Sequence, residues 1–187
     1  MARSMRSRLL SVLAVAVLSG GIAACGEEEE PFLRAETEAA WVDVGELRYQ
    51  VQISRPLNPG MRSDAELLSG LPDEYQRLPE NTTWFAVFVR IENETDRPHE
   101  SSKEFTIEDT QGATFEPIPV DNLIAYRPEL VPPRSLVPNE QSVAAFGQTQ
   151  GAMLLFQVPV PALDNRPLEL LIQSPDGRNE ATIDLDV

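Results

Sequence analysis

Few side chains of this sequence are of the types that carry out catalysis or bind metal ions. His99 is the only histidine and Cys25 the only cysteine among 187 residues. A zinc site needs several converging ligands, and an activated serine or cysteine needs a base beside it. His99 follows Pro98 in a turn-like stretch. We therefore expect a solvated loop histidine, no catalytic residues, no metal site and no cofactor.

Carboxylates are abundant, with 30 acidic residues in the chain, and two groups of them could bind calcium weakly. Asp184 and Asp186 would share one face of a strand. The second group is a loop cluster: Asp64, Glu66, Asp73 and Glu74. Neither group has ligands at the alternating positions of a calcium-binding loop. A hydrolase would require a cleft with two close carboxyl groups, one of raised pKa, and stays the third alternative for function.

The first residues have the order of a secretory signal peptide. Three arginines precede an apolar run over residues 9–18, and small residues lead to Cys25. The apolar stretch 9–24 contains Gly20-Gly21 and is shorter than the roughly 20 residues that span a bilayer. We expect residues 1–24 to be a signal peptide.

Cys25 is preceded by Ile22, Ala23 and Ala24, which resemble the lipobox of bacterial lipoproteins. The thiol of a lipobox cysteine receives a diacylglycerol, and cleavage makes that cysteine the mature N-terminus. Two acyl chains give a stable anchor where one does not. We expect lipidation of Cys25 and a place on the extracytoplasmic face of the cell membrane. The alternatives are an uncleaved anchor and ordinary cleavage after Ala24 with a free Cys25.

The charge of the chain excludes one class of partner. The formal net charge is −15, and residues 1–24 contain arginines but no acidic residue, so removal of the signal peptide would make the charge more negative. Phosphate backbones and anionic headgroups would repel the folded part, so we expect no nucleic acid. Residues 25–40 are polar and acidic and include Glu27–Glu30. We expect them to form a tether that is lipidated at Cys25. The remaining residues, 41–187, have the length of one domain.

Alternating apolar residues from Trp41 onward predict an all-β domain of seven to nine short strands. The strands are expected at residues 47–53, 84–91, 104–108, 114–116, 143–146, 152–158, 168–172 and 181–187. Pro56 and Pro59 should end the strand that contains Leu47, Tyr49, Val51 and Ile53 on one face. One short helix is expected at 64–68, with Ser63 or Asp64 as its N-cap. This pattern favours a β-sandwich.

Residues 117–138 hold six prolines and should form a long extended loop outside any central sheet. Long loops are often functional, although a crossover between two sheets is the simpler interpretation. Tyr126, Arg127 and Arg134 are the best candidates for a contact patch, because aromatic residues and arginine are favoured at binding hot spots. The alternative is that these arginines are scattered and only counter the acidic field.

Three stretches resemble a known family: residues 90–94 (RIENE), 103–117 (KEFTIEDTQGATFEP) and 151–159 (GAMLLFQVP). They are similar to the immunoglobulin-like domain of uncharacterised lipoproteins and secreted antigens of Gram-positive bacteria. The resemblance covers roughly residues 41–187 and implies an immunoglobulin-like β-sandwich. It also implies that Asn93 caps a strand edge, that Asp109 and Gly112 form a hairpin, and that Phe156 enters the core. It implies no catalytic residues.

These observations together predict a membrane-anchored extracytoplasmic lipoprotein that is not an enzyme. We expect it to work as an interaction module with an envelope protein as its partner. The alternative is an envelope carrier of a small ligand or a metal ion.

Overall fold

The computed structural model describes residues 30–146 and 149–186. Cys25, the lipobox residues Ile22, Ala23 and Ala24, and the predicted signal peptide all lie outside the described residues. The compact unit begins at Pro31. Part of the expected tether therefore belongs to the fold. Ala35 is buried in the core, and its short strand pairs in parallel with the last strand of the chain.

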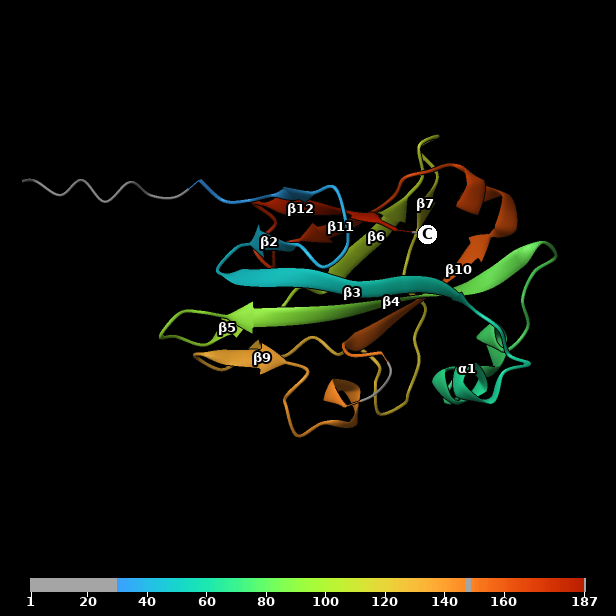
Figure 1. Ribbon diagram of the computed structural model, residues 1–187, viewed down its shortest axis with the longest axis horizontal. Coiled ribbons are helices and arrows are strands. Elements are labelled where there is room, and N and C mark those ends of the chain that lie inside the picture. Colours follow the sequence, from blue (N-terminus) through green and yellow to red (C-terminus); the bar gives the residue numbers. More distant parts are fainter. Residues whose placement is uncertain (1–29, 147–148, 187) are drawn as a thin grey trace, which may run out of the picture. The chain divides into compact units, whose positions relative to one another are not determined.

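The described chain forms two main sheets that face each other, which makes the domain a β-sandwich (Figure 1). The first sheet has the order β1 (Arg34–Ala35), β12 (Glu180–Leu185), β11 (Leu168–Gln173), β6 (Glu104–Glu108) and β7 (Thr114–Phe115). The second has the order β10 (Ala152–Pro159), β4 (Thr82–Asn93), β3 (Leu47–Leu57) and β2 (Trp41–Val44). All pairs except β1–β12 are antiparallel.

Smaller elements complete the domain. Strand β9 (Ser135–Val137) continues the β10 side of β4, and β5 (His99–Glu100) pairs with β8 (Leu130–Val131). The helical turns are α1 (Arg62–Leu67), η1 (Asp73–Tyr75), η2 (Val143–Ala145) and η3 (Val160–Asp164). Residues 116–134 link β7 of the first sheet to β9 of the second, so most of the segment 117–138 is a crossover. Its last part, β9, pairs with β4, which corrects the expectation that the whole segment lies outside any central sheet.

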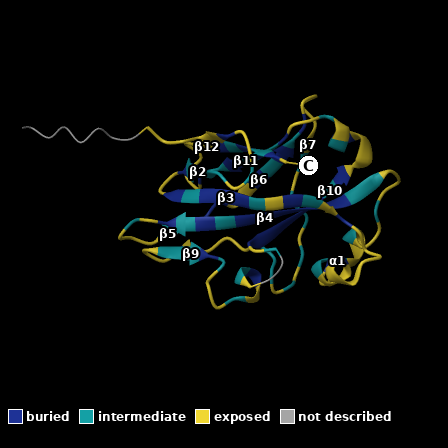
Figure 2. Cartoon of the chain, viewed as in Figure 1, coloured by how far each residue is buried: buried dark blue, intermediate teal, exposed yellow. Residues whose placement is uncertain are grey.

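Strand β4 is buried on both faces, as its sequence predicts (Figure 2). Phe85, Val87 and Val89 belong to the core between the sheets. Trp84 and Phe88 point to the opposite face and belong to a second apolar cluster. Since consecutive side chains alternate across a strand, a third layer must cover this outer face.

The structure corrects the prediction for β3. A β-bulge between Val51 and Ile53 shifts the register, so Ile53 turns away from the core and is exposed. The strand also continues through Pro56 to Leu57. Strand β2 accompanies β3 only from Leu47 to Gln50. At Pro56 the strand therefore has a free edge, where a residue without an N–H is tolerated.

Two further predictions of local structure are wrong. Residues 143–145 form a 3-10 turn instead of a strand. The side chain of Asn139 accepts the amide of Gln141, and its carbonyl accepts the amide of Ser142, which starts a series of turns. The expected N-cap, Ser63 or Asp64, is also wrong: helix α1 follows an N-cap at Met61 that makes no side-chain hydrogen bond. The carboxylate of Asp64 bonds instead to Arg55 and to the amide of Asn58.

Candidate functional site

An outer layer covers the second sheet, and we define it as residues 58–81 and 117–126. Apolar side chains of both segments pack on the second cluster, among them Leu67, Tyr75 and Ile118. The proline-rich segment runs along the free edge of β10. The amide of Ile118 donates to the carbonyl of Leu155 at 2.7 Å, and Met153 exchanges hydrogen bonds of 2.7 and 2.8 Å with residues 124 and 126. This segment protects an otherwise unpaired strand edge.

The two segments of the outer layer are joined to each other by hydrogen bonds. The side-chain amide of Asn122 donates to the carbonyls of Leu67 at 2.8 Å and Ser69 at 3.2 Å. Its oxygen accepts the amides of Ile124 and Ala125. Asn122 therefore links the two segments through a side chain whose full hydrogen-bonding capacity is used.

A cavity of about 740 Å³ opens between α1, the turn at residues 121–124 and the residues Val143, Phe146 and Thr149. Phe88, Leu67 and Ile124 contribute to its lining. Three large apolar side chains at the same cavity are mostly exposed: Leu123 by 83%, Phe146 by 71% and Val143 by 60%. We call this the outer-layer cavity. Exposed apolar side chains gathered at one place mark interaction sites on soluble proteins.

Arg55 and Asp64 form a fixed polar pair beside this cavity. The guanidinium donates to the two carboxylate oxygens at 2.7 and 3.0 Å, and the amide of Asn58 donates to the same carboxylate at 2.9 Å. The hydrogen bonds from Arg55 lower the pKa of Asp64. Asp64 is buried in the first turn of α1. Arg55 neutralises its charge and holds this turn against β3.

Of the three residues predicted for a contact patch, Tyr126 and Arg127 share a cavity of about 490 Å³ on another part of the surface. The hydroxyl of Tyr126 donates to the carbonyl of Ser102 at 2.6 Å, and its ring packs edge-on against Phe105 at 5.0 Å. Burial raises the pKa of Tyr126. Arg127 forms an ion pair with Asp121. These contacts give Tyr126 a structural role.

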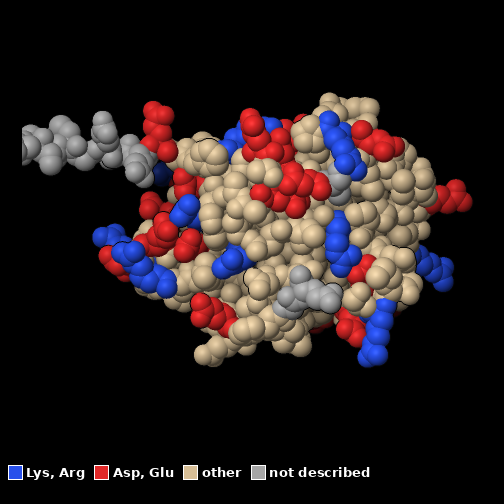
Figure 3. All heavy atoms as spheres, viewed as in Figure 1, with Lys and Arg blue, Asp and Glu red and all other residues tan. Residues whose placement is uncertain are grey.

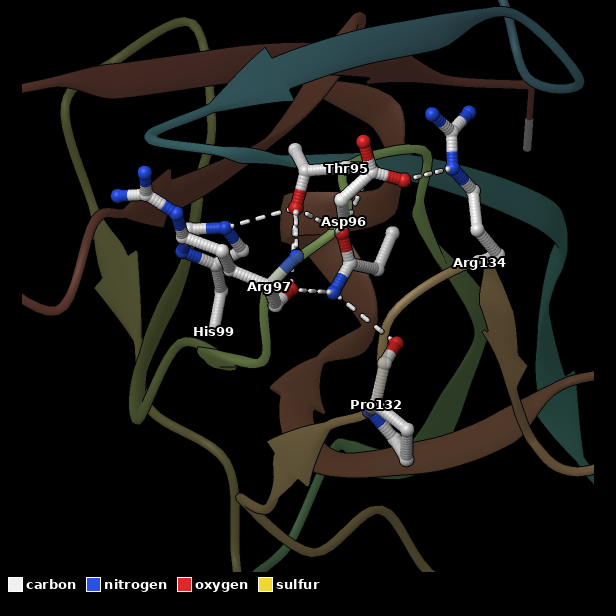
Figure 4. A network of polar contacts seen from close by, with 7 residues as sticks. Thr95, Asp96, Arg97, His99, Pro132 and Arg134 are labelled. Atoms are coloured by element: carbon white, nitrogen blue, oxygen red, sulfur yellow. Dashed lines mark hydrogen bonds and ion pairs between the residues drawn. The ribbon is translucent and has the colours of Figure 1, made fainter.

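Arg134 lies apart from Tyr126 and Arg127, at a different cavity of about 550 Å³. Figure 4 shows its guanidinium directed toward Asp96, with 3.0 Å between Nε and the carboxylate. The buried Asn93 holds the loop beneath: its amide donates to the carbonyls of Arg97, Val131 and Pro132. The three predicted residues therefore do not form one patch in this structure, and a binding role for each stays a prediction.

The other side chains considered for chemistry have local partners. His99 Nε2 lies 2.9 Å from the hydroxyl of Thr95. Asp184 pairs with Arg34 at 2.8 Å, whereas Asp186 accepts from the hydroxyl of Thr37. Within residues 30–146 and 149–186, no three histidine, cysteine or acidic side chains are grouped as metal ligands. On the face drawn in Figure 3, acidic and basic side chains are interspersed.

Sequence reasoning missed Leu123, Val143 and Phe146. Each lies in a segment where apolar residues follow neither strand nor helix periodicity, in the stretches DNLIAY and SVAAFG. The signal that could have found this site is the presence of large apolar residues in irregular segments. An analysis of periodicity does not use that signal, and it assigned Val143 and Phe146 to a weak strand.

Comparisons with known proteins place the chain only coarsely. No family model matches the sequence, and no curated protein matches it. Among solved structures, the chain is similar to an uncharacterised β-sandwich protein from Clostridium difficile 630. The identity is 12% and the TM-score 0.42, over 86% of this chain and 98% of that one. This distant likeness carries no information about function. No described helix is both long and apolar enough to cross a membrane.

Proposed function

We propose that this chain is a lipid-anchored, extracytoplasmic immunoglobulin-like β-sandwich that binds an envelope protein through its outer layer. The single observation that carries the binding role is the exposure of Leu123, Val143 and Phe146 around one cavity. Full burial of an apolar side chain of this size is more favourable than its exposure to water by about 1.5–3 kcal/mol. A protein partner would remove that apolar surface from water.

The anchoring part of the proposal is supported by the order of residues before Cys25. The domain starts at Pro31, so only a few residues separate it from the anchor. At roughly 3.3–3.6 Å per residue, this link would keep the domain close to the membrane surface. Figure 1 shows the first described residues beside β12, at the end of the sandwich opposite α1. The outer-layer cavity, which α1 borders, would then be available to a neighbouring envelope protein.

Site-specific photo-crosslinking in membranes of the source cells tests the binding role. A photoreactive residue at Leu123 should yield one reproducible crosslinked protein. The matched position is Leu130 on β8, which is 58% exposed but does not line the outer-layer cavity. Equal products at both positions, or no product at Leu123 in abundant, membrane-bound protein, would contradict the proposal.

Processing tests the anchor separately. The Cys25→Ser variant should accumulate as an unprocessed precursor, and the unaltered chain should incorporate a labelled fatty acid. A normally cleaved, membrane-bound Cys25→Ser product would exclude lipidation and would leave the binding experiment valid.

A further inference from the structure

The outer face of the first sheet differs from that of the second sheet, because no apolar layer of the described residues covers it. In β6, β11 and β12, the residues that alternate with the buried core positions are half-buried or exposed. Leu171 lies at the centre of this face, with Thr106 and Thr182 as its register partners. An antiparallel sheet commonly leaves one polar face in water, and Leu171 is the apolar exception among these three strands.

One row of carboxylates on this face repels itself. Glu108, Glu169 and Asp184 lie directly opposite one another across β6, β11 and β12. Like charges in such positions destabilise a sheet. Arg34 compensates part of this row, because its guanidinium donates to Glu169 at 2.7 Å and to Asp184 at 2.8 Å. The chain therefore supplies a cation of its own for this row.

A second row of carboxylates lies toward the other end of the three strands. Glu104 and Glu180 flank Gln173 in register, and their backbones lie roughly 9–10 Å apart because neighbouring strands are about 4.7–4.9 Å apart. Glu116 lies beside this row, since its carboxylate accepts from the hydroxyl of Thr106 at 3.3 Å. None of the ion pairs among the described residues includes any of these three glutamates.

A cavity of about 260 Å³ lies among these three glutamates, and we call it the acidic cavity. Its lining consists of Glu104, Thr106, Glu116, Leu171, Gln173 and Glu180. Leu171 supplies its apolar surface, and no basic residue is part of the lining. The volume is below the roughly 300–1,000 Å³ of small-molecule sites. The acidic cavity therefore suits one long side chain better than a whole small molecule.

We propose that the outer face of the first sheet docks a basic segment of a partner protein, with one lysine or arginine side chain of that segment in the acidic cavity. The aliphatic stem of this side chain packs on Leu171, and its charged end lies between Glu104 and Glu180. Long basic side chains bury their stems on apolar surface in this way while the charge stays in water. The excess of carboxylates on this face attracts such a segment and selects against acidic partners.

This inference goes beyond the proposed function, because it concerns the other sheet. The acidic cavity shares no lining residue with the outer-layer cavity. A partner at Leu123 and a basic segment at Leu171 could therefore bind independently, and the failure of one experiment would leave the other valid.

An NMR titration of the full-length chain with a blocked pentapeptide tests the proposal. The peptide has lysine at its two ends, valine in the middle and threonine between them. In an extended peptide these lysines and the valine share one face, with the same spacing as the rows of the sheet. The backbone amide resonances of Thr106 and Leu171 should shift in a saturable manner. A peptide with glutamate in place of both lysines should not shift them.

A third peptide tests the role of the aliphatic stem. It carries diaminopropionate, which has a single methylene group, in place of both lysines. This peptide should bind at least about three-fold more weakly than the lysine peptide, because fewer methylene groups are buried on Leu171. Equal affinities of the two peptides would overturn the proposal.

Two double variants separate the acidic cavity from the net charge of the chain. Glu104→Gln with Glu180→Gln should weaken binding of the lysine peptide by about three- to ten-fold, as expected for the loss of two partly exposed ion pairs. The matched control is Glu74→Gln with Glu80→Gln, which removes the same charge from exposed positions outside the acidic cavity. The control should leave the affinity unchanged.

Three results would contradict the docking of a basic segment. Equal losses of affinity in the two double variants would show that only the net charge attracts the peptide. The absence of a saturable shift with the lysine peptide would overturn the proposal directly. Saturable shifts of the same amides with calcium chloride, but not with the lysine peptide, would show that the face takes a metal ion instead.

Discussion

The amide of Asp121 donates a hydrogen bond of 3.0 Å to the carbonyl of Gly70, and the two backbones lie almost in contact. A methyl group added to Gly70 would come within 2.0 Å of the carbonyl oxygen of Asp121. This contact joins the two segments that cover the second sheet, residues 58–81 and 117–126. The outer-layer cavity lies where they meet, with Asp121 in its lining.

Replacement of Gly70 by alanine should therefore destabilise the domain strongly. Gly70 has a φ of +82°, which costs an L-residue about 1–2 kcal/mol, and the backbone clash adds to that. We expect a loss of at least about 2 kcal/mol in the free energy of unfolding, measured by urea denaturation. Gly177→Ala is the control: its φ is +68°, but the nearest atom to the added carbon is 3.9 Å away. This variant should lose only the free energy that the positive φ costs. Equal losses of unfolding free energy in the two variants would argue against the close contact between Gly70 and Asp121.

Loss of the Arg55 guanidinium should leave the buried Asp64 without compensation. Arg55→Met should lower the free energy of unfolding at neutral pH by about 2–3 kcal/mol, less than for a fully buried pair because the Arg55 side chain is 31% exposed. Arg62→Met is the control, since the Arg62–Glu66 pair is largely exposed. That variant should lose less than about 0.5 kcal/mol in chemical denaturation.

The stabilisation from the Arg55–Asp64 pair should depend on pH. Arg55 holds the pKa of Asp64 below its usual value, so the carboxylate binds its proton less readily in the folded state. Its contribution to stability is complete above the unfolded pKa of about 3.9 and is lost as the pH falls toward the folded value. The difference between the unaltered chain and Arg55→Met should therefore shrink below about pH 4. A constant difference across that range would show that the pair makes no electrostatic contribution.

The contribution of Glu38 to stability should depend on pH in the opposite direction to that of Asp64. Burial raises its pKa, so its charged form is less favourable in the folded state than in the unfolded state. Stability should rise as the pH falls through the folded pKa, because protonation removes this penalty. Glu38→Gln should raise the melting temperature at neutral pH by up to about 2–4 °C and have no effect at acid pH. Glu36→Gln, on the exposed part of the same segment, should change little at either pH.

Much of the sandwich was predictable because its strands carry their own pattern. Strand β6 has the expected bounds, and β4 and β11 differ by a few residues at their ends. In each, apolar residues alternate or fill both faces according to position in the sheet. The turn at Asp109 and Gly112 was equally readable, since Gly112 has a φ of +81° and donates to the carbonyl of Asp109.

Other features depended on contacts that periodicity does not encode. The bulge beside Ile53 is set by pairing with β4, and the short strand β1 is set by pairing with β12, far away in the sequence. The outer layer was visible only as two irregular segments rich in proline and polar residues. Apolar residues of these segments pack on the second face of β4, so the exposed Leu123 was not distinguishable by sequence from the half-buried Leu67.

The measurement that tests the central claim most directly combines stability and binding in one double variant, Leu123→Ser with Phe146→Ser. Both side chains are mostly exposed, so the free energy of unfolding should change by no more than about 0.5 kcal/mol for each. A photoreactive residue at Val143, which lines the same cavity, should crosslink a partner in the parent chain and lose that product in the double variant. An undiminished product, or a large loss of stability that reveals a packing role, would contradict the account.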